Sequence, residues 1–357
     1  MTQPAARQPV AIVGWARTPM LRRTDKTEAH LLFDVVTGAT EDAGITRADV
    51  DFSCAGSCDY VAGQAFSFVQ NIDAVGAWPP KRDSHVEMDG AWALYEAWVR
   101  LQLGDIDVAI AMGSGRSSTA DPATIYPMEM DPYYLAPLGA DALTFAALQA
   151  RVLLDAGLVT ERQLAEVAAR TRGDARTNPY AQVSGEYDVD ALLEEEYVRA
   201  PLRRHDLAPI TDGAAAVVIA RGDRARELTD HPVWITGFAH SAEAHQPGVR
   251  DLRTSASARR AAKAAGADTA PIEVAELQTA FTHEEPLLAA ALGLGPEVAL
   301  NPSGGPLAAN PVMATGLIRV IEAAQQIRDH GTRRALAHAT SGPCLQQNLV
   351  AVLEGDR

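Results

Sequence analysis

The sequence predicts a layered α/β fold. Short β-branched or apolar runs alternate with helical patterns along nearly all of the 357 residues. The run Asp107–Gly113 (D-V-A-I-A-M-G) is almost free of polar breaks, which is typical of a strand covered on both faces. A chain of this length can bury a core large enough for two domains or one fused double domain. These observations favour helices packed on both faces of mostly parallel sheets.

The first half of the chain supplies the expected elements in a regular order. Val10–Gly14 (V-A-I-V-G) is β-branched and predicts a strand, and the apolar spacing of Thr27–Gly44 predicts a helix. Val50–Gly56 predicts a second strand. Gly90–Leu103, rich in Ala, Trp and Leu, predicts a helix that leads into the strand at Asp107–Gly113.

The middle of the chain, residues 118–207, has a different amino-acid composition. It begins with tyrosines, prolines and methionines (I-Y-P-M-E-M-D-P-Y-Y-L-A-P-L) and continues with charged helical segments such as Thr160–Arg172. Long insertions of this kind often carry binding loops. We therefore expect a lid over the sheet, in which Tyr133 and Tyr134 either line a ligand pocket or pack the loop onto the core.

After the lid the alternation of strands and helices resumes. Thr211–Ala220 (T-D-G-A-A-A-V-V-I-A) predicts a turn and a strand. The later expected elements are a strand at Pro232–Phe238, an alanine-rich helix at Ala256–Ala265, a strand at Pro271–Leu277, a helix at Met313–Arg328, and strands at Arg334–Ala339 and Asn348–Glu354.

An internal echo indicates a duplicated unit. The first set of motifs is Glu87–Gly90, a helix, Gly104 and D-V-A-I-A-M-G-S-G. It aligns in the same order with Asn301–Gly305, a helix, Gly331 and R-A-L-A-H-A-T-S-G. We therefore expect two related halves that place helix N-termini on either side of one cleft. The expected boundaries are 1–117 for the first half, 118–207 for the lid, 208–230 for the end of the first half and 231–357 for the second half.

The stretch Asn301–Gly316 (N-P-S-G-G-P-L-A-A-N-P-V-M-A-T-G) is a turn before a long amphipathic helix. Its paired glycines can take positive φ, and Pro311 suits the first turn of a helix. Such a turn can bring a helix N-terminus to a polar or anionic ligand. It can equally be a tight connection between a strand and a helix.

Composition excludes several classes of function. The net charge of −15 and a pI near 5.0 argue against nucleic acid or an acidic membrane surface as a partner. Cys54, Cys58 and Cys344 are too few for a disulfide framework, and the C-x3-C pair lacks the further ligands of a zinc site. No segment has the length of a transmembrane span or the character of a signal peptide. We expect a soluble cytoplasmic protein with no metal site.

Several motifs, in order, resemble those of the thiolase superfamily over nearly the whole chain. They are V-A-I-V-G-W-A-R-T-P, G-D-I-D-V-A-I-A-M-G-S-G-R-S-S, T-D-G-A-A-A-V-V-I-A and N-P-S-G-G-P-L-A-A-N-P-V-M-A-T-G. The chain is most similar in kind to sterol-carrier-protein-type thiolases and actinobacterial lipid-transfer proteins. The resemblance implies the thiolase fold, two fused βαβαβ halves in five α/β layers with a lid. It also implies a homodimer, an acyl-CoA substrate, and no bound cofactor beyond the coenzyme A of that substrate.

The positions of the thiolase catalytic residues are changed in this chain. The family's nucleophilic cysteine, in a C-x-S-G motif, falls on Glu87, and its G-H-P histidine falls on Asn310. The residue before the family's A-F pair falls on Gln278. The cysteine of its C-x-G motif falls on Gly342, with Cys344 two residues away. Ordinary thiolase chemistry needs a sulfur nucleophile, so we do not expect it here.

The residues at these positions suit chemistry without a covalent intermediate. Asn310 and Gln278 can donate hydrogen bonds to a thioester oxygen, and Glu87 can transfer protons if burial raises its pKa. His283 and His338 are further candidates for proton transfer. The set favours retro-aldol cleavage of a 3-hydroxyacyl-CoA. Some thiolase-like lipid-transfer proteins catalyse this step in steroid side-chain degradation, with a small partner that carries a zinc ribbon and an OB-fold.

The resemblance also suggests which residues contact the substrate. The candidates are Tyr133 and Tyr134 for the acyl chain, with Ser303, Gly304, Gly305 and Gly342. Two alternatives to a lyase remain open. One is an acyltransferase that uses Cys344, and the other is a non-catalytic subunit that holds an acyl-CoA or lipid for a partner.

Each catalytic candidate has a purely structural interpretation as well. Glu87 and Asp89 would be stabilised at the start of a helix whatever their function. His338, on an apolar strand, is compatible with a core histidine. His283 could be exposed beside Glu284.

Overall fold

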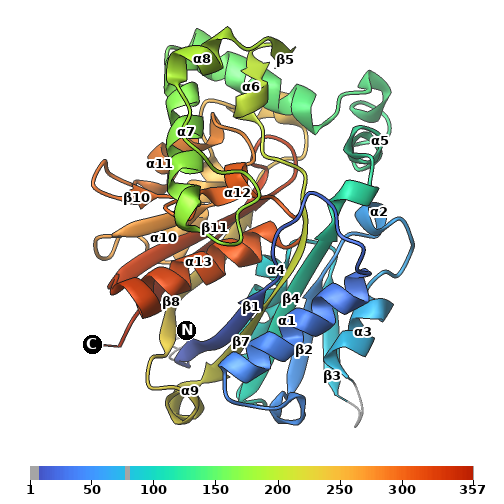
Figure 1. Ribbon diagram of the computed structural model, residues 1–357, viewed down its shortest axis with the longest axis vertical. Helices are drawn as coiled ribbons and strands as arrows, with labels where there is room; N and C mark the ends of the chain where they lie inside the picture. The colour runs from blue at the N-terminus through green and yellow to red at the C-terminus, as the bar shows by residue number, and fades with distance from the viewer. Residues whose placement is uncertain (1–7, 77–80, 357) are drawn as a thin grey trace, which may run out of the picture.

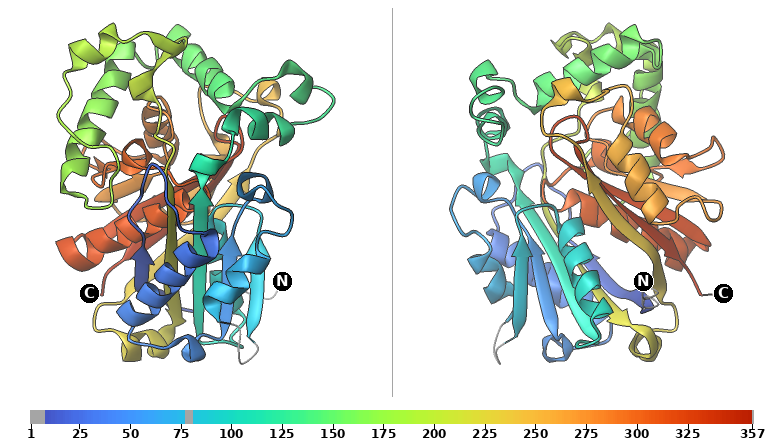
Figure 2. Two further views of the ribbon diagram at one scale, coloured as in Figure 1. Left: turned by 45° about the vertical axis from the view of Figure 1, so that its right-hand side comes forward. Right: turned by 180° about the vertical axis from the view of Figure 1, so that it is seen from behind.

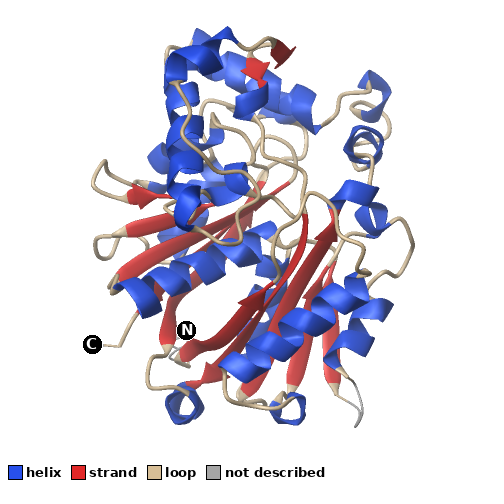
Figure 3. Ribbon diagram, in the orientation of Figure 1, coloured by secondary structure: helices blue, strands red, loops and turns tan. Residues whose placement is uncertain are grey.

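The computed structural model describes residues 8–76 and 81–356, and ten of its strands form one continuous sheet. The order across the sheet is β10-β9-β11-β12-β8-β1-β7-β4-β2-β3. The first half of the chain contributes β1 (Val10–Arg17), β2 (Phe52–Gly56), β3 (Arg82–Val86), β4 (Val108–Arg116) and β7 (Asp212–Arg221). The second half contributes β8 (Val233–Ala242), β9 (Val274–Leu277), β10 (Ala299–Leu300), β11 (Arg334–Ser341) and β12 (Gln347–Glu354). Strands β1 and β8 share only two residue pairs, so the sheet divides into two five-stranded parts (Figure 3).

The two parts have the same topology. In each, the first strand pairs antiparallel with the last, β1 with β7 and β8 with β12. The last strand pairs antiparallel with the fourth, β7 with β4 and β12 with β11. The fourth pairs parallel with the second, and the second pairs parallel with the third. The predicted duplication is therefore present in the order and direction of every strand.

Helices complete five layers. The central layer holds α4 (Gly90–Gln102) and α13 (Thr315–His330), whose buried faces pack against both sheet parts. The first part is covered outside by α1 (Glu28–Asp42) and α3 (Val69–Val75), and the second by α10 (Ala256–Ala264) and α11 (Glu284–Leu292). Figures 1 and 2 show how the halves lie, the first at the lower right and the second at the left of Figure 1. No helix in the described part of the chain is long and apolar enough to cross a membrane.

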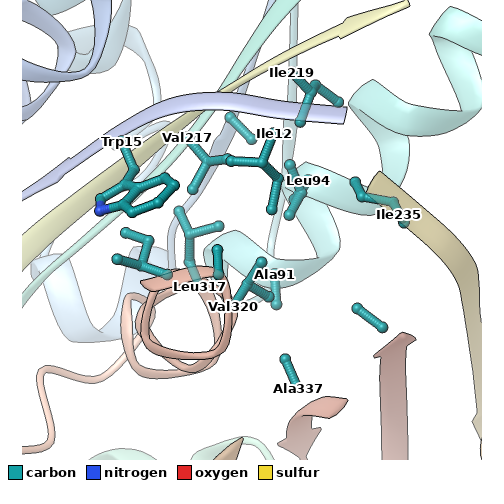
Figure 4. Packing of buried hydrophobic residues seen from close by; sticks show 14 of the residues in the cluster. Ile12, Trp15, Ala91, Leu94, Val217, Ile219, Ile235, Leu317, Val320 and Ala337 are labelled. Carbon is teal, nitrogen blue, oxygen red and sulfur yellow. The ribbon is translucent and has the colours of Figure 1, made fainter. Parts of the chain in front are cut away.

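The central core explains why the halves pack together. Leu94 of α4 and Leu317 of α13 are fully buried, and they lie among Ile12 of β1, Val217 of β7 and Ala337 of β11 (Figure 4). Each fully buried aliphatic side chain of leucine size stabilises the folded state by about 1.5–3 kcal/mol. Because both sheet parts and both helices contribute, neither half can bury its inner face alone.

Close backbone contacts fix the start of the central helices. A Cβ atom on Gly113 would lie 2.4 Å from the carbonyl oxygen of Met313, and one on Gly115 would lie 1.8 Å from that of Val312. The amide of Gly90 donates to the Met313 carbonyl at 2.8 Å. Any side chain at Gly113 or Gly115 would push this loop away. The G-S-G at the end of β4 therefore lets the loop before α13 lie against the start of α4.

The segment between β4 and β7 forms the lid. It contains α5 (Pro122–Met128), α6 (Ala142–Asp155), α7 (Glu161–Asp174), α8 (Val189–Glu194) and a hairpin of β5 (Tyr197–Arg199) and β6 (Leu202–Arg203). In Figure 1, α6 to α8 lie above the second half, and α5 stands apart on the other side. The amides of Gln182 and Val183 both donate to the carbonyl of Ala308, which ties the returning chain to the second half.

Every predicted strand and helix named above is present within a few residues of its predicted bounds. Among the elements that the sequence did not predict are β3, β10 and α11, and the short helices α2 (Asp59–Ala62), α9 (Gly222–Leu228) and α12 (Gly305–Ala308). Strand β10 has only two residues, and β3 (R-D-S-H-V) is exposed and polar, so neither shows an apolar pattern.

Two details of the predicted turn at residues 301–316 were wrong. The central helix of the second half begins at Thr315, so Pro311 lies before it and not in its first turn. The echo also placed 301–305 opposite Glu87–Gly90. Residues 301–305 instead lead into the four-residue helix α12, whereas the helix that the echo paired with α4 is α13, its topological counterpart. The second half has extra chain at this point, and a register based on two short turns cannot detect it.

Candidate active site at the N-termini of the central helices

The N-termini of α4 and α13 meet at one buried carboxylate, that of Asp89. Its Oδ1 accepts hydrogen bonds from the amides of Ala91 at 2.8 Å and Leu317 at 3.0 Å. Its Oδ2 accepts one from the amide of Gly316 at 2.9 Å. Asp89 is only 3% exposed, and burial raises its pKa above the ordinary value, although the three amides and Arg319 oppose the shift. The residue expected to cap one helix therefore caps the central helices of both halves.

Gln278 lies beside this point, directly after β9. Its Oε1 accepts a hydrogen bond from the amide of Thr340 at 3.1 Å. A backbone amide can only donate, so this contact fixes which end of the side chain is oxygen. A Cβ atom on Gly316 would lie 2.9 Å from that Oε1 and 2.7 Å from Asp89 Oδ1. The Nε2 group of Gln278 has no hydrogen-bond partner among the residues that the structure describes.

Asn310 reaches the same helix end from the preceding loop. Its Oδ1 accepts a hydrogen bond from the hydroxyl of Thr315 at 2.8 Å, and its own backbone amide donates to the hydroxyl of Thr211 at 2.9 Å. Its Nδ2 group likewise has no partner in residues 8–76 and 81–356. Two half-buried side-chain amides, each held through its oxygen, thus flank the first turn of α13 with their N–H groups free.

Glu87 lies in an exposed position before α4. Its Oε1 accepts a hydrogen bond from the amide of Asp59, at the start of the short helix α2. The neighbouring thiol of Cys58 lies 3.6 Å from Glu129 Oε1, and partial burial raises the pKa of Glu129, with Glu87 adding to the shift. The sequence-based role of Glu87 in proton transfer required burial of its carboxyl group. The Glu87 side chain is exposed, so this burial is not present.

The two histidines lie away from these amides. His338 Nε2 lies 2.8 Å from Asn348 Oδ1, and Asn348 Nδ2 donates to Ser257 Oγ at the start of α10. The His338 side chain therefore points to the outer face of the sheet, whereas α13 and its neighbour Gln278 lie on the inner face. Burial lowers the pKa of His338 to about 4.

His283 is fully buried at the start of α11, so it is not exposed beside Glu284. Neither of its ring nitrogens has a hydrogen-bond partner in the described chain. Burial lowers the pKa of His283 to about 3 and raises that of Glu284 to about 8. Gln278 and Asn310 thus both lie beside the first turn of α13, whereas the side chains of the two histidines are fully buried.

None of the three cysteines has the environment of a reactive thiolate. Burial raises the pKa of Cys54, of Cys58 and of Cys344 to about 12 in each case. The thiol of Cys344 donates to the carbonyl of Phe145 at 3.4 Å. Reactive cysteines need a lowered pKa, which these sites do not provide. No group of His, Cys, Asp and Glu side chains within the described ranges is arranged to hold a metal ion.

Ser303, expected to contact substrate, lies in a buried ionic network. Its hydroxyl donates to Glu276 Oε2 at 2.7 Å and accepts from Arg319 Nη1 at 2.8 Å. Arg319 also forms an ion pair with Glu276 at 2.6 Å. Burial raises the pKa of Glu276 to about 7, against the opposing effect of Arg319. The sequence motifs did not predict this network, although a glutamate inside an apolar strand (E-V-A-E-L) is a signal for a buried ion pair.

The other expected substrate contacts are spread over three loops. Gly304 and Gly305 begin α12 with φ values of 92° and 57°. Gly342 follows β11 with φ of 76°. Tyr133 and Tyr134 lie on the lid and are 81% and 71% exposed, so neither packs the loop onto the core.

One pocket on the surface of the molecule lies away from these residues. It has a volume of about 730 Å³, and its lining includes Pro271, Arg334 and Glu354. Strands β9 and β11 begin near it, whereas Gln278 follows the end of β9. It contains none of the predicted site residues.

Comparison with known sequences links the chain to enzymes of acyl-CoA metabolism. No family model matches it. An acetyl-CoA acetyltransferase of Methanothermobacter thermautotrophicus is 27% identical, with 93% of this chain and 94% of that protein covered. A 17-hydroxy-3-oxo-4-pregnene-20-carboxyl-CoA lyase of Mycobacterium tuberculosis is 24% identical, with 66% of this chain and 64% of that protein covered.

Comparison with solved structures identifies the fold. The structure named Ltp2-ChsH2(DUF35) aldolase matches with a TM-score of 0.82 and 21% identity, covering 98% of each chain. Human mitochondrial 3-ketoacyl-CoA thiolase matches with a TM-score of 0.79 and 15% identity, covering 98% of this chain and 99% of the other. The chain has the thiolase fold that its motifs predicted.

Proposed function

We propose that this chain is a thiolase-fold enzyme that cleaves a 3-hydroxyacyl-CoA by a retro-aldol reaction, without a cysteine nucleophile. The observation that carries the proposal is the pair of side-chain amides of Gln278 and Asn310. Each is anchored through its oxygen beside the first turn of α13, and each keeps its N–H groups free. The similarity to a CoA lyase in sequence and to an aldolase in fold supports the same reaction class.

The proposed reaction needs a proton acceptor, an oxyanion site and a proton donor. The acceptor removes the proton of the 3-hydroxyl group, and the bond between C2 and C3 breaks. Carbon 3 becomes a ketone or aldehyde, and the electron pair passes to C2 and the thioester oxygen as an enolate. Gln278 Nε2 and Asn310 Nδ2 donate hydrogen bonds to that oxygen. A proton then returns to C2 and yields the shortened acyl-CoA, with no change of oxidation state overall and no cofactor besides the coenzyme A of the substrate.

We assign proton transfer to Glu87. Its side chain lies before α4 and is open to solvent, whereas the neighbouring carboxylate of Asp89 is buried and accepts from three amides. A general base must reach the proton that it abstracts, and the side chains of His283 and His338 are fully buried. Tyr133 and Tyr134 are exposed on the lid, where an acyl chain can contact them.

We also propose that the enzyme works in an assembly in the cytoplasm. The name of the solved aldolase joins two components, Ltp2 and ChsH2(DUF35). We infer a homodimer of this chain and a separate small subunit with a zinc ribbon and an OB-fold. Steroid or lipid side-chain catabolism is the process that these relatives favour.

An acyltransferase is the second candidate, because an acetyl-CoA acetyltransferase is similar over almost the whole chain. That reaction requires a thiolate to carry the acyl group. Cys344 is the nearest thiol to the altered motif, and burial raises its pKa to about 12. The protonation of this thiol at neutral pH favours the lyase.

Product analysis by mass spectrometry distinguishes the two reactions. One substrate is a tertiary 3-hydroxyacyl-CoA, and the other is a 3-ketoacyl-CoA with free CoA, each with untreated and iodoacetamide-treated enzyme and its co-purified partner. Ketone release from the hydroxy substrate, unchanged by alkylation, supports the lyase. Thiolysis of the keto substrate that alkylation abolishes would identify an acyltransferase.

A further inference from the structure

We propose that Asp89 is the residue that prevents thiolate chemistry at this site and so restricts the enzyme to reactions without an acyl-enzyme. The inference deepens the proposed function and rests on it for the assignment of position 87 to the reacting centre. Asp89 stands two residues after Glu87, and its carboxylate lies on the N-termini of both central helices.

Asp89 offsets the dipoles of both central helices. A helix N-terminus carries about half an elementary positive charge, which acts mainly within its first turn. Two such ends, those of α4 and α13, converge on Asp89, and together they offset about one negative charge. Asp89 supplies that charge at hydrogen-bonding distance, so little positive potential remains for a second anion.

Individual amides at the starts of both central helices also have acceptors already. At the start of α4, Gly90 donates to the Met313 carbonyl and Ala91 donates to Asp89. At the start of α13, Gly316 and Leu317 both donate to Asp89. These four amides, two at the start of each central helix, already have acceptors, so they are not available to a second anion.

This arrangement affects the ionisation of a thiol placed at position 87. A thiolate is stabilised at a helix N-terminus when the amides and the dipole face it. Here the buried carboxylate of Asp89 accepts the hydrogen bonds of these amides and offsets the dipoles of both helices. A cysteine at position 87 would therefore stay protonated at neutral pH, whereas the neutral amides of Gln278 and Asn310 can still bind a developing oxyanion.

The test replaces residue 87 and measures the introduced thiol directly. The variants are Glu87→Cys, and Glu87→Cys combined with Asp89→Ser, which keeps a capping hydroxyl and removes the charge. The rate at which iodoacetamide alkylates the introduced thiol is followed from pH 6 to 10 by peptide mass spectrometry, which separates this thiol from the three native cysteines. No substrate is present, so the result does not depend on which reaction the enzyme catalyses.

We expect the introduced thiol of the single variant to titrate at or above the ordinary thiol value of about 8.5. In the double variant the same thiol should titrate at least about one pH unit lower, with about tenfold faster alkylation at pH 7. Equal titration of the introduced thiol in both variants, within about 0.3 pH unit, would overturn the proposal.

Two further variants keep the test decisive. Glu87→Cys with Asp141→Ser removes a capping carboxylate from the lid helix α6 and should titrate like the single variant. An equal shift with Asp141→Ser would show that charge removal anywhere has this effect, and would refute a specific role for Asp89. If Asp89→Ser does not fold, as judged by circular dichroism, Asp89→Asn takes its place under the same criteria.

Discussion

The amide of Thr340 donates to Gln278 Oε1 at 3.1 Å, and this hydrogen bond decides which end of the Gln278 side chain is available to a ligand. Because the oxygen is held by the backbone of β11, the Nε2 group is left to donate. Asn310 Oδ1 lies 2.8 Å from the hydroxyl of Thr315, which is also 2.9 Å from the carbonyl of Pro311. Two independent anchors thus present donors at the same helix end.

Replacing Gln278 with Glu keeps the shape and the Thr340 hydrogen bond but exchanges a donor for a negative acceptor. Loss of an oxyanion donor typically lowers kcat by about 100- to 1,000-fold, and we expect a loss in this range for acyl-CoA cleavage. Because the new carboxylate lies beside that of Asp89, the urea midpoint should fall, and kcat is compared under conditions where circular dichroism shows both proteins folded. A Gln278→Glu enzyme with ordinary kcat would remove Gln278 from the mechanism.

Replacing Thr315 with Val removes the hydroxyl that orients Asn310. The side-chain amide of Asn310 would then rotate freely. Because this donor would be misplaced and not missing, we expect kcat to fall by about tenfold. The decisive comparison is Thr315→Ser, which restores the hydroxyl and should restore kcat. Equal activity of the Val and Ser variants would show that the hydroxyl does not position Asn310.

His338 should make folding sensitive to acid. Burial lowers its folded pKa to about 4, below the unfolded value near 6.5. Above pH 6.5 both states are neutral, so its contribution is constant there. As the pH falls below 6.5 the unfolded state binds a proton first, and stability is lost until about pH 4. In urea titrations, the stability difference between the unchanged protein and His338→Gln should therefore be smaller at pH 5 than at pH 7.5; a constant difference contradicts this.

Glu284 should have the opposite effect at alkaline pH. Burial raises its folded pKa to about 8, above the ordinary value of 4.5, so the folded state holds the proton more tightly. Its stabilising contribution is complete below pH 4.5 and is lost as the pH rises to about 8. Glu284→Gln cannot ionise, so its stability relative to the unchanged protein should rise between pH 6 and pH 9. No relative gain over that range would show that Glu284 is already ionised at pH 6.

Most of the fold was predictable because each main strand carries its own apolar signal. V-A-I-V-G and D-V-A-I-A-M-G are buried on both sides, and the structure places them as β1 and β4. Strand β3 could not be recognised, because its side chains are polar and it owes its place to pairing with β2. The alignment of residues 301–305 with Glu87–Gly90 was wrong because the extra chain before Thr315 has no counterpart in the first half.

The site was predictable only in part. The motif alignment singled out Gln278 and Asn310, but not the contacts that orient them. Thr340 is 62 residues from Gln278 in sequence, and Asp89 reaches amides more than 220 residues away. Such contacts depend on how the halves pack, and no local spacing encodes them. The exposure of Glu87 likewise depends on the packing of α2 beside it.

One reaction in D₂O tests whether cleavage passes through an enolate with no covalent enzyme intermediate. The enzyme, with its co-purified partner, is mixed with a tertiary 3-hydroxyacyl-CoA, quenched early, and analysed for small-molecule products and intact protein mass. We predict a ketone, an acyl-CoA with one deuterium at C2, and a protein of unchanged mass. A protein carrying the acyl group, or an acyl-CoA product without deuterium, would contradict the account.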